Sequence, residues 1–196
     1  MKKMILIMVV LLHLFTVVQL YSEPTFGPLT EPFLRMMESE RFHISATLMA
    51  NATTTDISIY QRGENRAMVM TVAGQRMRMV VRDGIAHIIV DSQRMILTAP
   101  ADEADTAGLV DISQLRFVEE GTARFGGRRR TYEEYTIGEE RIQYFVDGER
   151  FLGMRIFEGR RAVAEIMVNE FNQRVPNHVF DIPTNFTVRE VENFRM

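Results

Sequence analysis

The feature that most constrains this fold is the two-residue alternation of apolar and polar side chains between Arg66 and Ala99. Short apolar runs in this stretch are separated by turn signals, and no segment keeps the period of a helix. The pattern predicts four consecutive antiparallel strands. Asp83-Gly84 is the clearest hairpin signal, because a two-residue type I′ turn needs positive φ at both central positions and these residue types tolerate it.

Methionine is concentrated on these predicted strands. Met68 and Met70 share one face of their strand, and Met77 and Met79 share one face of the next. Unbranched, polarizable side chains suit a surface that adapts to flexible apolar ligands, which favours a ligand cavity. The alternative is a core in which methionine only fills space, and composition alone does not separate the two interpretations.

The N-terminus has the layout of a secretory signal peptide. Lys2 and Lys3 precede an apolar run from Ile5 to Leu20, and polar residues with a small Ser22 follow. We therefore expect a signal peptide over residues 1–22 and one domain over residues 23–196. The alternative is a retained membrane anchor, although the run of about sixteen residues is shorter than the roughly eighteen expected of a spanning helix.

The composition of the chain limits its expected cellular location and the classes of partner that it can bind. The 196-residue chain contains no cysteine, so it has neither a disulfide framework nor an N-terminal lipid attachment site of the bacterial lipoprotein type. A disulfide-free exported protein is typical of bacteria, and we expect a periplasmic or extracellular location. Loss of Lys2 and Lys3 with the signal leaves a net charge of about −5, which argues against a nucleic-acid partner.

The rest of the chain continues the β pattern after one short helix. Pro32 starts a helix that runs to Glu38, with Met36 and Met37 among its apolar residues, and alternation begins at Phe42. Turn signals recur along the chain and include a second Asp-Gly pair, Asp147-Gly148. The prediction is a mainly β, α+β fold: a single curved antiparallel sheet of about eleven strands that forms an unclosed barrel over one or more short helices.

No residue constellation indicates catalysis or metal binding. The histidines His13, His43, His87 and His178 are scattered, and no serine lies in a nucleophile-elbow pattern. The carboxylate pair Glu133-Glu134 is interpreted as a solvated strand end, because neighbours along a strand point to opposite faces. We predict a protein that is not an enzyme and that needs no cofactor or metal.

Arginines cluster in the second half of the chain. Arg128-Arg129-Arg130 could dock an anionic head group or an acidic protein partner. The alternative is an exposed strand edge that charge keeps soluble.

Several segments together resemble the periplasmic lipoprotein-carrier and outer-membrane lipoprotein-sorting family. The matching pieces are the signal segment, the short amphipathic helix before Phe42, Arg66 at the position of a strand-borne arginine, Asp83-Gly84 leading into Ile85–Val90, and the closing segment 169–186. In that closing segment a final strand, a Val-Pro turn and a Phe-x-Ile-Pro sequence follow one another. Pro176 and Pro183 lack a backbone N–H and stop the hydrogen bonding of a strand ladder on either side of Val179–Ile182. These residues are therefore predicted to form a short edge segment.

The resemblance implies an incomplete barrel with a hydrophobic cavity on its concave face. We expect a monomeric carrier or binding protein for a lipid, a lipoprotein acyl chain or a similar amphiphile, which exchanges its ligand with a membrane-associated protein partner. The candidate ligand-binding residues are Met68, Met70, Met77, Met79, Met36, Met37 and Arg66. The alternative function is a periplasmic or surface interaction or sensor module that docks a protein through a strand edge or the arginine cluster.

Overall fold

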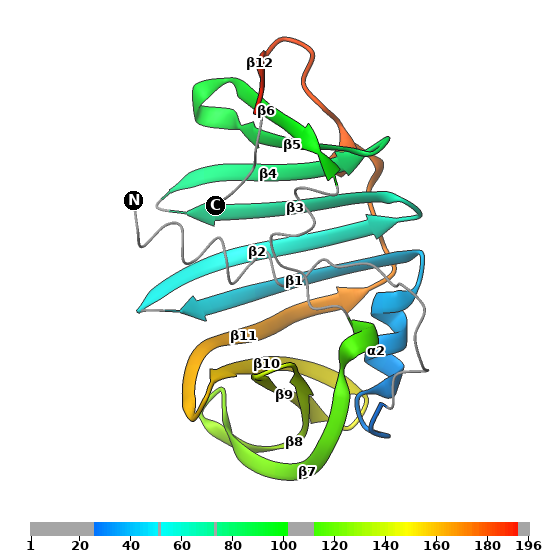
Figure 1. Ribbon diagram of the computed structural model, residues 1–196, viewed down its shortest axis with the longest axis vertical. Coiled ribbons are helices and arrows are strands. Elements are labelled where there is room, and N and C mark those ends of the chain that lie inside the picture. The colour runs from blue at the N-terminus through cyan, green and yellow to red at the C-terminus, as the bar shows by residue number, and fades with distance from the viewer. Residues whose placement is uncertain (1–25, 51, 73, 102–111, 192–196) are drawn as a thin grey trace.

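The computed structural model describes residues 26–50, 52–72, 74–101 and 112–191 (Figure 1). Its main body is a single sheet of 12 strands that does not close into a barrel, accompanied by one short α-helix. The predicted fold class is thus confirmed, with one strand more than the number expected. The predicted signal peptide, residues 1–22, lies outside the described residues.

One helix precedes the strands along the chain. In chain order the elements are α2 (Glu31–Glu38), β1 (Arg41–Ala50), β2 (Thr53–Arg62), β3 (Asn65–Val72), β4 (Gln75–Arg82), β5 (Ile85–Val90), β6 (Met95–Pro100), β7 (Arg116–Phe125), β8 (Arg128–Ile137), β9 (Glu140–Asp147), β10 (Arg150–Glu158), β11 (Arg161–Asn172) and β12 (Thr187–Glu190). Three 3₁₀ turns accompany them among the described residues: η1 (Asp91–Gln93), η2 (Ile112–Gln114) and η3 (Asn177–Phe180).

Two meanders build the sheet. Its strand order is β12-β6-β5-β4-β3-β2-β1-β11-β10-β9-β8-β7, so the pairing of β1 with β11 joins the first meander to the second. Figure 1 shows β2 to β6 spread out as an open wall, whereas β7 to β10 curl tightly near α2. Edge strand β12 is parallel to β6, in contrast to the antiparallel pairing elsewhere in the sheet.

The stretch from Arg66 to Ala99 forms the predicted strands β3 to β6. Arg82 pairs with Ile85 across the first Asp-Gly hairpin, and φ is 53° at Asp83 and 74° at Gly84, as a type I′ turn requires. The second predicted hairpin also forms, but with different geometry. There Asp147 pairs with Arg150 and positive φ occurs at Gly148, so the turn residues are shifted by one position.

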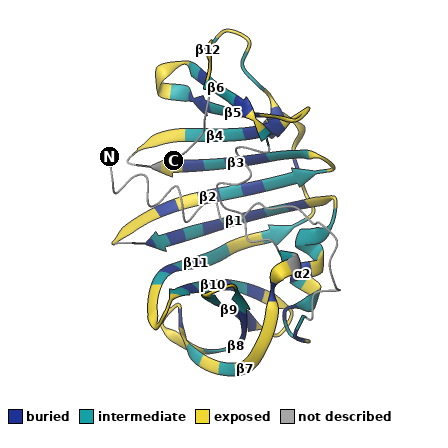
Figure 2. Ribbon diagram, in the orientation of Figure 1, coloured by how far each residue is buried: buried dark blue, intermediate teal, exposed yellow. Residues whose placement is uncertain are grey.

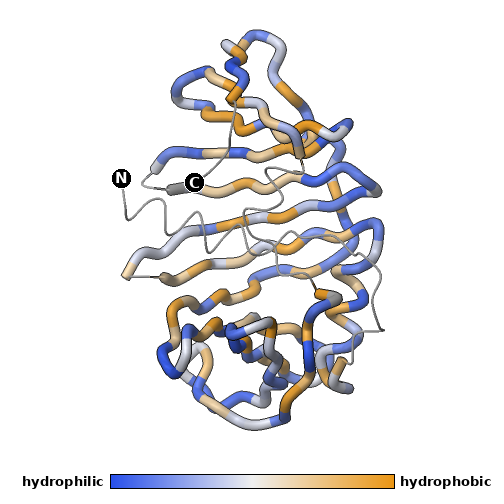
Figure 3. The backbone as a smooth tube through the Cα atoms, in the orientation of Figure 1, coloured by the Kyte–Doolittle hydropathy of each residue, from blue (hydrophilic) through white to orange (hydrophobic). Residues whose placement is uncertain are grey.

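Burial follows the alternation that the sequence shows. Every second residue along β1 is buried, from Phe42 to Ala50 (Figure 2). Figure 3 shows that hydrophobic residues recur along the strands of the sheet, while many of the turns that connect them are hydrophilic. Such a pattern places one set of side chains on each face of the sheet and defines two separate cores.

The larger core lies on the face that carries α2, which we call the helix face. It joins Leu34 of α2 to buried residues of β1, β2, β3, β8, β9, β10 and β11. Pro32 occupies the first turn of the helix, and Glu31 and Arg35 form an ion pair of 3.0 Å one turn apart. Phe33 packs on Phe151, with ring centroids 5.6 Å apart. So short a helix depends on this packing, because it is not stable alone.

The smaller core lies on the opposite face, which we call the back face. It joins Ala67, Val80, Ile89 and Ile96 of the sheet to residues of the C-terminal segment. The prediction of a short edge segment over Val179–Ile182 was wrong, because residues 177–180 form η3 and pack against the back face. Burial of Val179 and Phe180 holds the segment there, and β12 supplies the edge strand instead.

Candidate functional site

Two rows of apolar side chains cross the helix face from β2 to β6. The register places Ile59, Met68, Met79, Ile88 and Leu97 in the first row. It places Ile57, Met70, Met77, Val90 and Met95 in the second. Directly opposite residues of antiparallel strands share a face and touch, so each row is a continuous apolar strip. We call the two rows together the methionine face.

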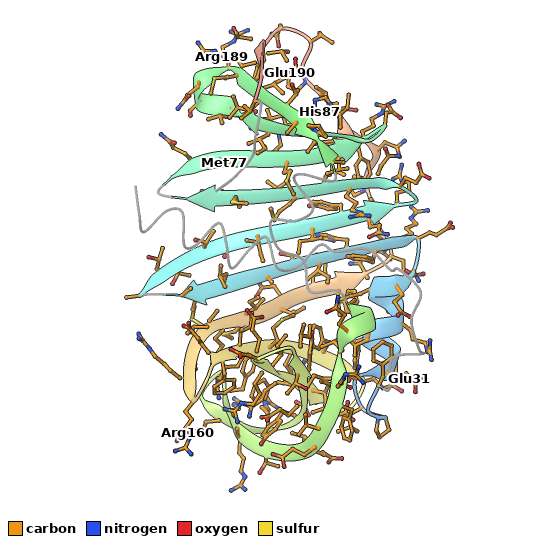
Figure 4. The ribbon with its side chains drawn as sticks, viewed as in Figure 1. Glu31, Met77, His87, Arg160, Arg189 and Glu190 are labelled. Carbon is orange, nitrogen blue, oxygen red and sulfur yellow. The ribbon has the colours of Figure 1, made fainter. Side chains whose placement is uncertain are left out.

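Burial decreases along the methionine face. Met68 and Met70 on β3 are only 1% and 5% exposed and belong to the helix-face core. Met77 and Met79 on β4 are half-buried and pack against that core from its edge. Figure 4 labels Met77 on β4, in the open wall and away from α2. The sheet therefore keeps accessible apolar surface at β4 and beyond, where Ile88, Met95 and Leu97 are also half-buried, although Val90 in the second row is buried.

The structure brings the predicted site residues to one face. Met68 is the direct cross-strand partner of Met79, and Met70 is the partner of Met77. Met36 and Met37 of α2 are half-buried and pack against the same core. Arg66 lies on the same face of β3, paired in register with Gln61 and Val81. The β3 pair fills the core, as the alternative interpretation expects, whereas the β4 pair is half-buried and packs at the edge of that core.

A buried carboxylate ties the start of α2 to β8. Glu133 is fully buried and accepts hydrogen bonds from the amides of Leu29 (2.9 Å) and Thr30 (3.0 Å). It also accepts bonds from the Thr30 hydroxyl at 2.6 Å and the Tyr135 hydroxyl at 3.1 Å. A Cβ on Gly27 would lie 2.3 Å from the same carboxylate, so this approach requires glycine. We call this cluster the Glu133 latch.

The interpretation of Glu133-Glu134 as a solvated strand end was therefore wrong. The two side chains do point to opposite faces, but each is buried and has its own partners. Glu134 accepts a hydrogen bond of 2.9 Å from Gln143 and lies 3.5 Å from the Arg141 guanidinium. Buried carboxylates are tolerated because they are hydrogen-bonded. No local sequence pattern signals that Leu29 and Thr30, more than a hundred positions away, bind Glu133.

Burial also changes the acidity of two tyrosines on the helix face. Loss of water around Tyr135 raises its pKa to about 12, although hydrogen bonds with Thr30 and the Gly27 amide oppose the shift. Complete burial raises the pKa of Tyr144 further above its usual range. Both phenols are neutral at physiological pH, which suits structural rather than acid-base roles.

The arginine cluster is largely engaged by its own hairpin. Arg130 forms an ion pair with Asp147, and Arg129 donates to the Thr122 hydroxyl at 2.9 and 2.7 Å. Arg128 and Arg129 are exposed at the turn between β7 and β8. The cluster is thus a charged turn at the start of β8, which is not an edge strand, because it pairs with both β7 and β9.

Histidine chemistry is limited in the described part of the chain. His43 stacks on Tyr60 with centroids 4.4 Å apart, and burial lowers the pKa of His43. No group of three or more His, Cys, Asp or Glu side chains within the described ranges is placed to hold a metal ion. Likewise, no helix among those same residues is long and apolar enough to cross a membrane.

Comparison with known proteins gives matches at the level of structure. No protein-family model matches the chain, and no curated protein matches it. An uncharacterized conserved protein from Thermus thermophilus superposes with a TM-score of 0.59 at 11% identity, covering 83% of this chain and 99% of that one. MucB superposes with a TM-score of 0.50 at 16% identity, covering 85% of this chain and 66% of MucB.

A protein described as an outer membrane lipoprotein-sorting domain, from Vibrio parahaemolyticus, is also similar. Its TM-score is 0.41 at 8% identity, with 78% of this chain and 94% of that one covered. The fold predicted from the sequence is shared with the Thermus thermophilus protein and with MucB. At such low identities these likenesses establish the fold alone, and this chain spans about two thirds of MucB.

Proposed function

We propose that this chain is an exported, non-enzymatic protein that binds or carries a lipid, a lipoprotein acyl chain or a similar amphiphile on the helix face. The observation that carries the proposal is the burial gradient of the methionine face, from the buried Met68 and Met70 to the half-buried Met77 and Met79. Flexible methionine side chains next to a fixed core can repack around an acyl chain without disturbing the sheet.

Covering this apolar surface with an acyl chain is energetically favourable. Each methylene removed from water contributes about 0.8 kcal/mol, so burial of eight methylenes contributes about 6 kcal/mol before the cost of ordering the chain. In this proposal Met77 and Met79 contact the acyl chain directly, and Met36 and Met37 border it from α2. Arg66, two residues before Met68 on the same face, lies where it can meet a polar head group.

Export and domain organisation belong to the same proposal. Residues 1–22 act as a signal peptide that is removed, and residues 23–196 form a single carrier-like domain that works as a monomer in the periplasm or outside the cell. N-terminal sequencing of protein recovered from the periplasm tests this part. A mature N-terminus near residue 23 supports it, whereas an intact N-terminus in the membrane fraction supports the retained anchor.

Native mass spectrometry and fatty-acid binding test the ligand. We expect protein purified without detergent to carry a lipid-sized mass, and to bind a dansyl-labelled fatty acid with a rise in fluorescence. The double change Met77→Gln and Met79→Gln should weaken binding at least about tenfold, equivalent to about 1.4 kcal/mol. Met49→Gln is the matched control, since Met49 is also half-buried on a strand but belongs to the back face.

Two results would contradict the proposal. One is a ligand-free protein that also ignores the labelled fatty acid. The other is equal weakening by the control variant, because the effect would then not depend on the methionine face.

A second candidate function is protein docking along β7. That strand ends the sheet, and its Phe117 and Val118 are 37% and 49% exposed. An end strand with apolar side chains can accept a strand from a partner. MucB, which shares the fold, has been solved as the Pseudomonas aeruginosa MucA/MucB complex. Val118→Lys should abolish partner capture from periplasmic extract if docking uses this edge, and unchanged capture would count against it.

A further inference from the structure

A polar cleft opens on the back face of the sheet, on the other side of β2 to β4 from the methionine face. It has a volume of about 590 Å³. Its lining residues are Ser58, Tyr60, Val69, Arg76, Arg78, Asp91, His178 and Val179. The sheet forms its floor, and η3 of the C-terminal segment forms one wall. A sheet and a turn held by the back-face core make this a preformed site.

Arg78 is the most constrained cation of the cleft. Its side chain is 14% exposed, and one Nη donates to Asp91 Oδ1 at 3.1 Å while the other donates to the Asp181 carbonyl at 3.3 Å. Its buried Nε has no hydrogen-bond partner among the described residues. Each Nη donates one of its two N–H groups in these contacts, so the guanidinium keeps further N–H groups that can donate to an incoming acceptor.

Arg76 adds a second guanidinium on the same face of β4. It is exposed and forms no ion pair with any residue that the structure describes. Among the charged lining residues, two arginines face one carboxylate, Asp91, which pairs with Arg78; Asp56, two strands away, is not a lining residue. The cleft therefore retains surplus positive charge, although the chain as a whole is acidic.

The uncharged lining residues complement these arginines. Ser58 and Tyr60 contribute hydroxyl groups, and His178 adds a further polar side chain from η3. Val69 and Val179 supply apolar walls. Donors on β2 and β4 thus flank apolar Val69 on β3, an arrangement that fits an anionic group attached to a small organic body.

We propose that the back-face cleft binds an anionic group of the carboxylate or phosphate class, held by the guanidiniums of Arg76 and Arg78. A remaining Nη N–H of Arg78 donates one hydrogen bond and Arg76 closes over the anion from the exposed side. The site is independent of the proposed lipid site, because the sheet separates the two faces. One small ligand cannot occupy both, so this cleft gives the protein a second binding function.

Calorimetric titration with inorganic phosphate at constant ionic strength tests the proposal, with chloride as the reference anion. We expect saturable binding that chloride does not reproduce. Arg76→Gln should weaken it at least tenfold, and Arg82→Gln, on the same strand and face but outside the cleft, should leave it unchanged. Arg78→Lys keeps the charge but removes the planar guanidinium and its spare Nη N–H groups, and should also weaken binding. Circular dichroism checks that each variant folds.

Vesicles then separate the two sources of such an anion. Arg76-dependent binding to phosphatidylglycerol vesicles but not to phosphatidylcholine vesicles assigns the cleft to a lipid head group. Phosphate binding without vesicle binding assigns it to a free anion. The proposal is overturned if phosphate behaves like chloride and no Arg76-dependent vesicle binding occurs, or if Arg82→Gln weakens binding as much as Arg76→Gln.

Discussion

The Glu133 latch yields a quantitative prediction. Glu133→Ala removes the acceptor for the part-buried Leu29 amide and the buried Thr30 amide and leaves both without that partner. The Thr30 and Tyr135 hydroxyls can still bond each other at 2.6 Å. An unsatisfied buried donor costs about 1–3 kcal/mol, and the cavity adds to this, so we expect a loss of about 3–5 kcal/mol. Glu133→Gln keeps one oxygen and should cost about half as much.

Urea unfolding followed by circular dichroism measures this loss. Thermal unfolding, also followed by circular dichroism, should give a Tm that Glu133→Ala lowers by about 10 °C in a domain of this size. Glu139→Ala is the matched control, because Glu139 is exposed on the turn after β8 and its removal should change stability by less than about 0.5 kcal/mol. If Glu133→Ala destabilises the protein no more than Glu139→Ala does, the latch does not hold α2 and the reasoning is refuted.

Three further predictions concern the sheet and its titrating groups. Gly153→Ala should lower the free energy of unfolding by several kcal/mol more than Gly159→Ala. Both glycines have positive φ, but only a Cβ on Gly153 would lie 1.9 Å from the Ile166 carbonyl oxygen. Equal losses of unfolding free energy in urea would contradict this. Because the pKa of Tyr135 is raised in the folded protein, the contribution of this residue to stability is complete below pH 10 and is lost as pH rises towards 12. Tyr135→Phe should therefore flatten the plot of unfolding free energy against pH between these values. An unchanged plot would argue against this assignment. The lowered pKa of His43 predicts that stability falls as pH drops below about 6.5, and nuclear magnetic resonance titration should give a midpoint below that of a free imidazole.

The strands of the open wall could be predicted from local sequence. Alternation and turn chemistry act over two to four residues, so β3 to β6 and the Asp83-Gly84 turn follow from the residues themselves. The two-residue alternation also predicted that Met68 and Met70 share one face of their strand, and that Met77 and Met79 share one face of theirs. That the two pairs share one face followed only from the register of β3 with β4, which the structure supplies.

Features that depend on distant parts of the chain could not be predicted. Glu133 meets Leu29 across 104 positions, and nothing near Glu133 marks it as buried. The pairing of β1 with β11 and the packing of η3 on the back face likewise depend on tertiary contacts. The prolines correctly indicated an interruption of the ladder at 176 and 183, but not which surface would bury Val179 and Phe180.

The central claim is that the accessible end of the methionine face contacts an amphiphile. Nuclear magnetic resonance of protein labelled with ¹³C-methyl methionine tests it directly, by titration with a fatty acid that carries a spin label. We predict that the methyl signals of Met77 and Met79 broaden at saturating ligand while that of Met49, on the back face, does not. Unchanged Met77 and Met79 signals, or broadening of Met49 to the same extent, would contradict the account.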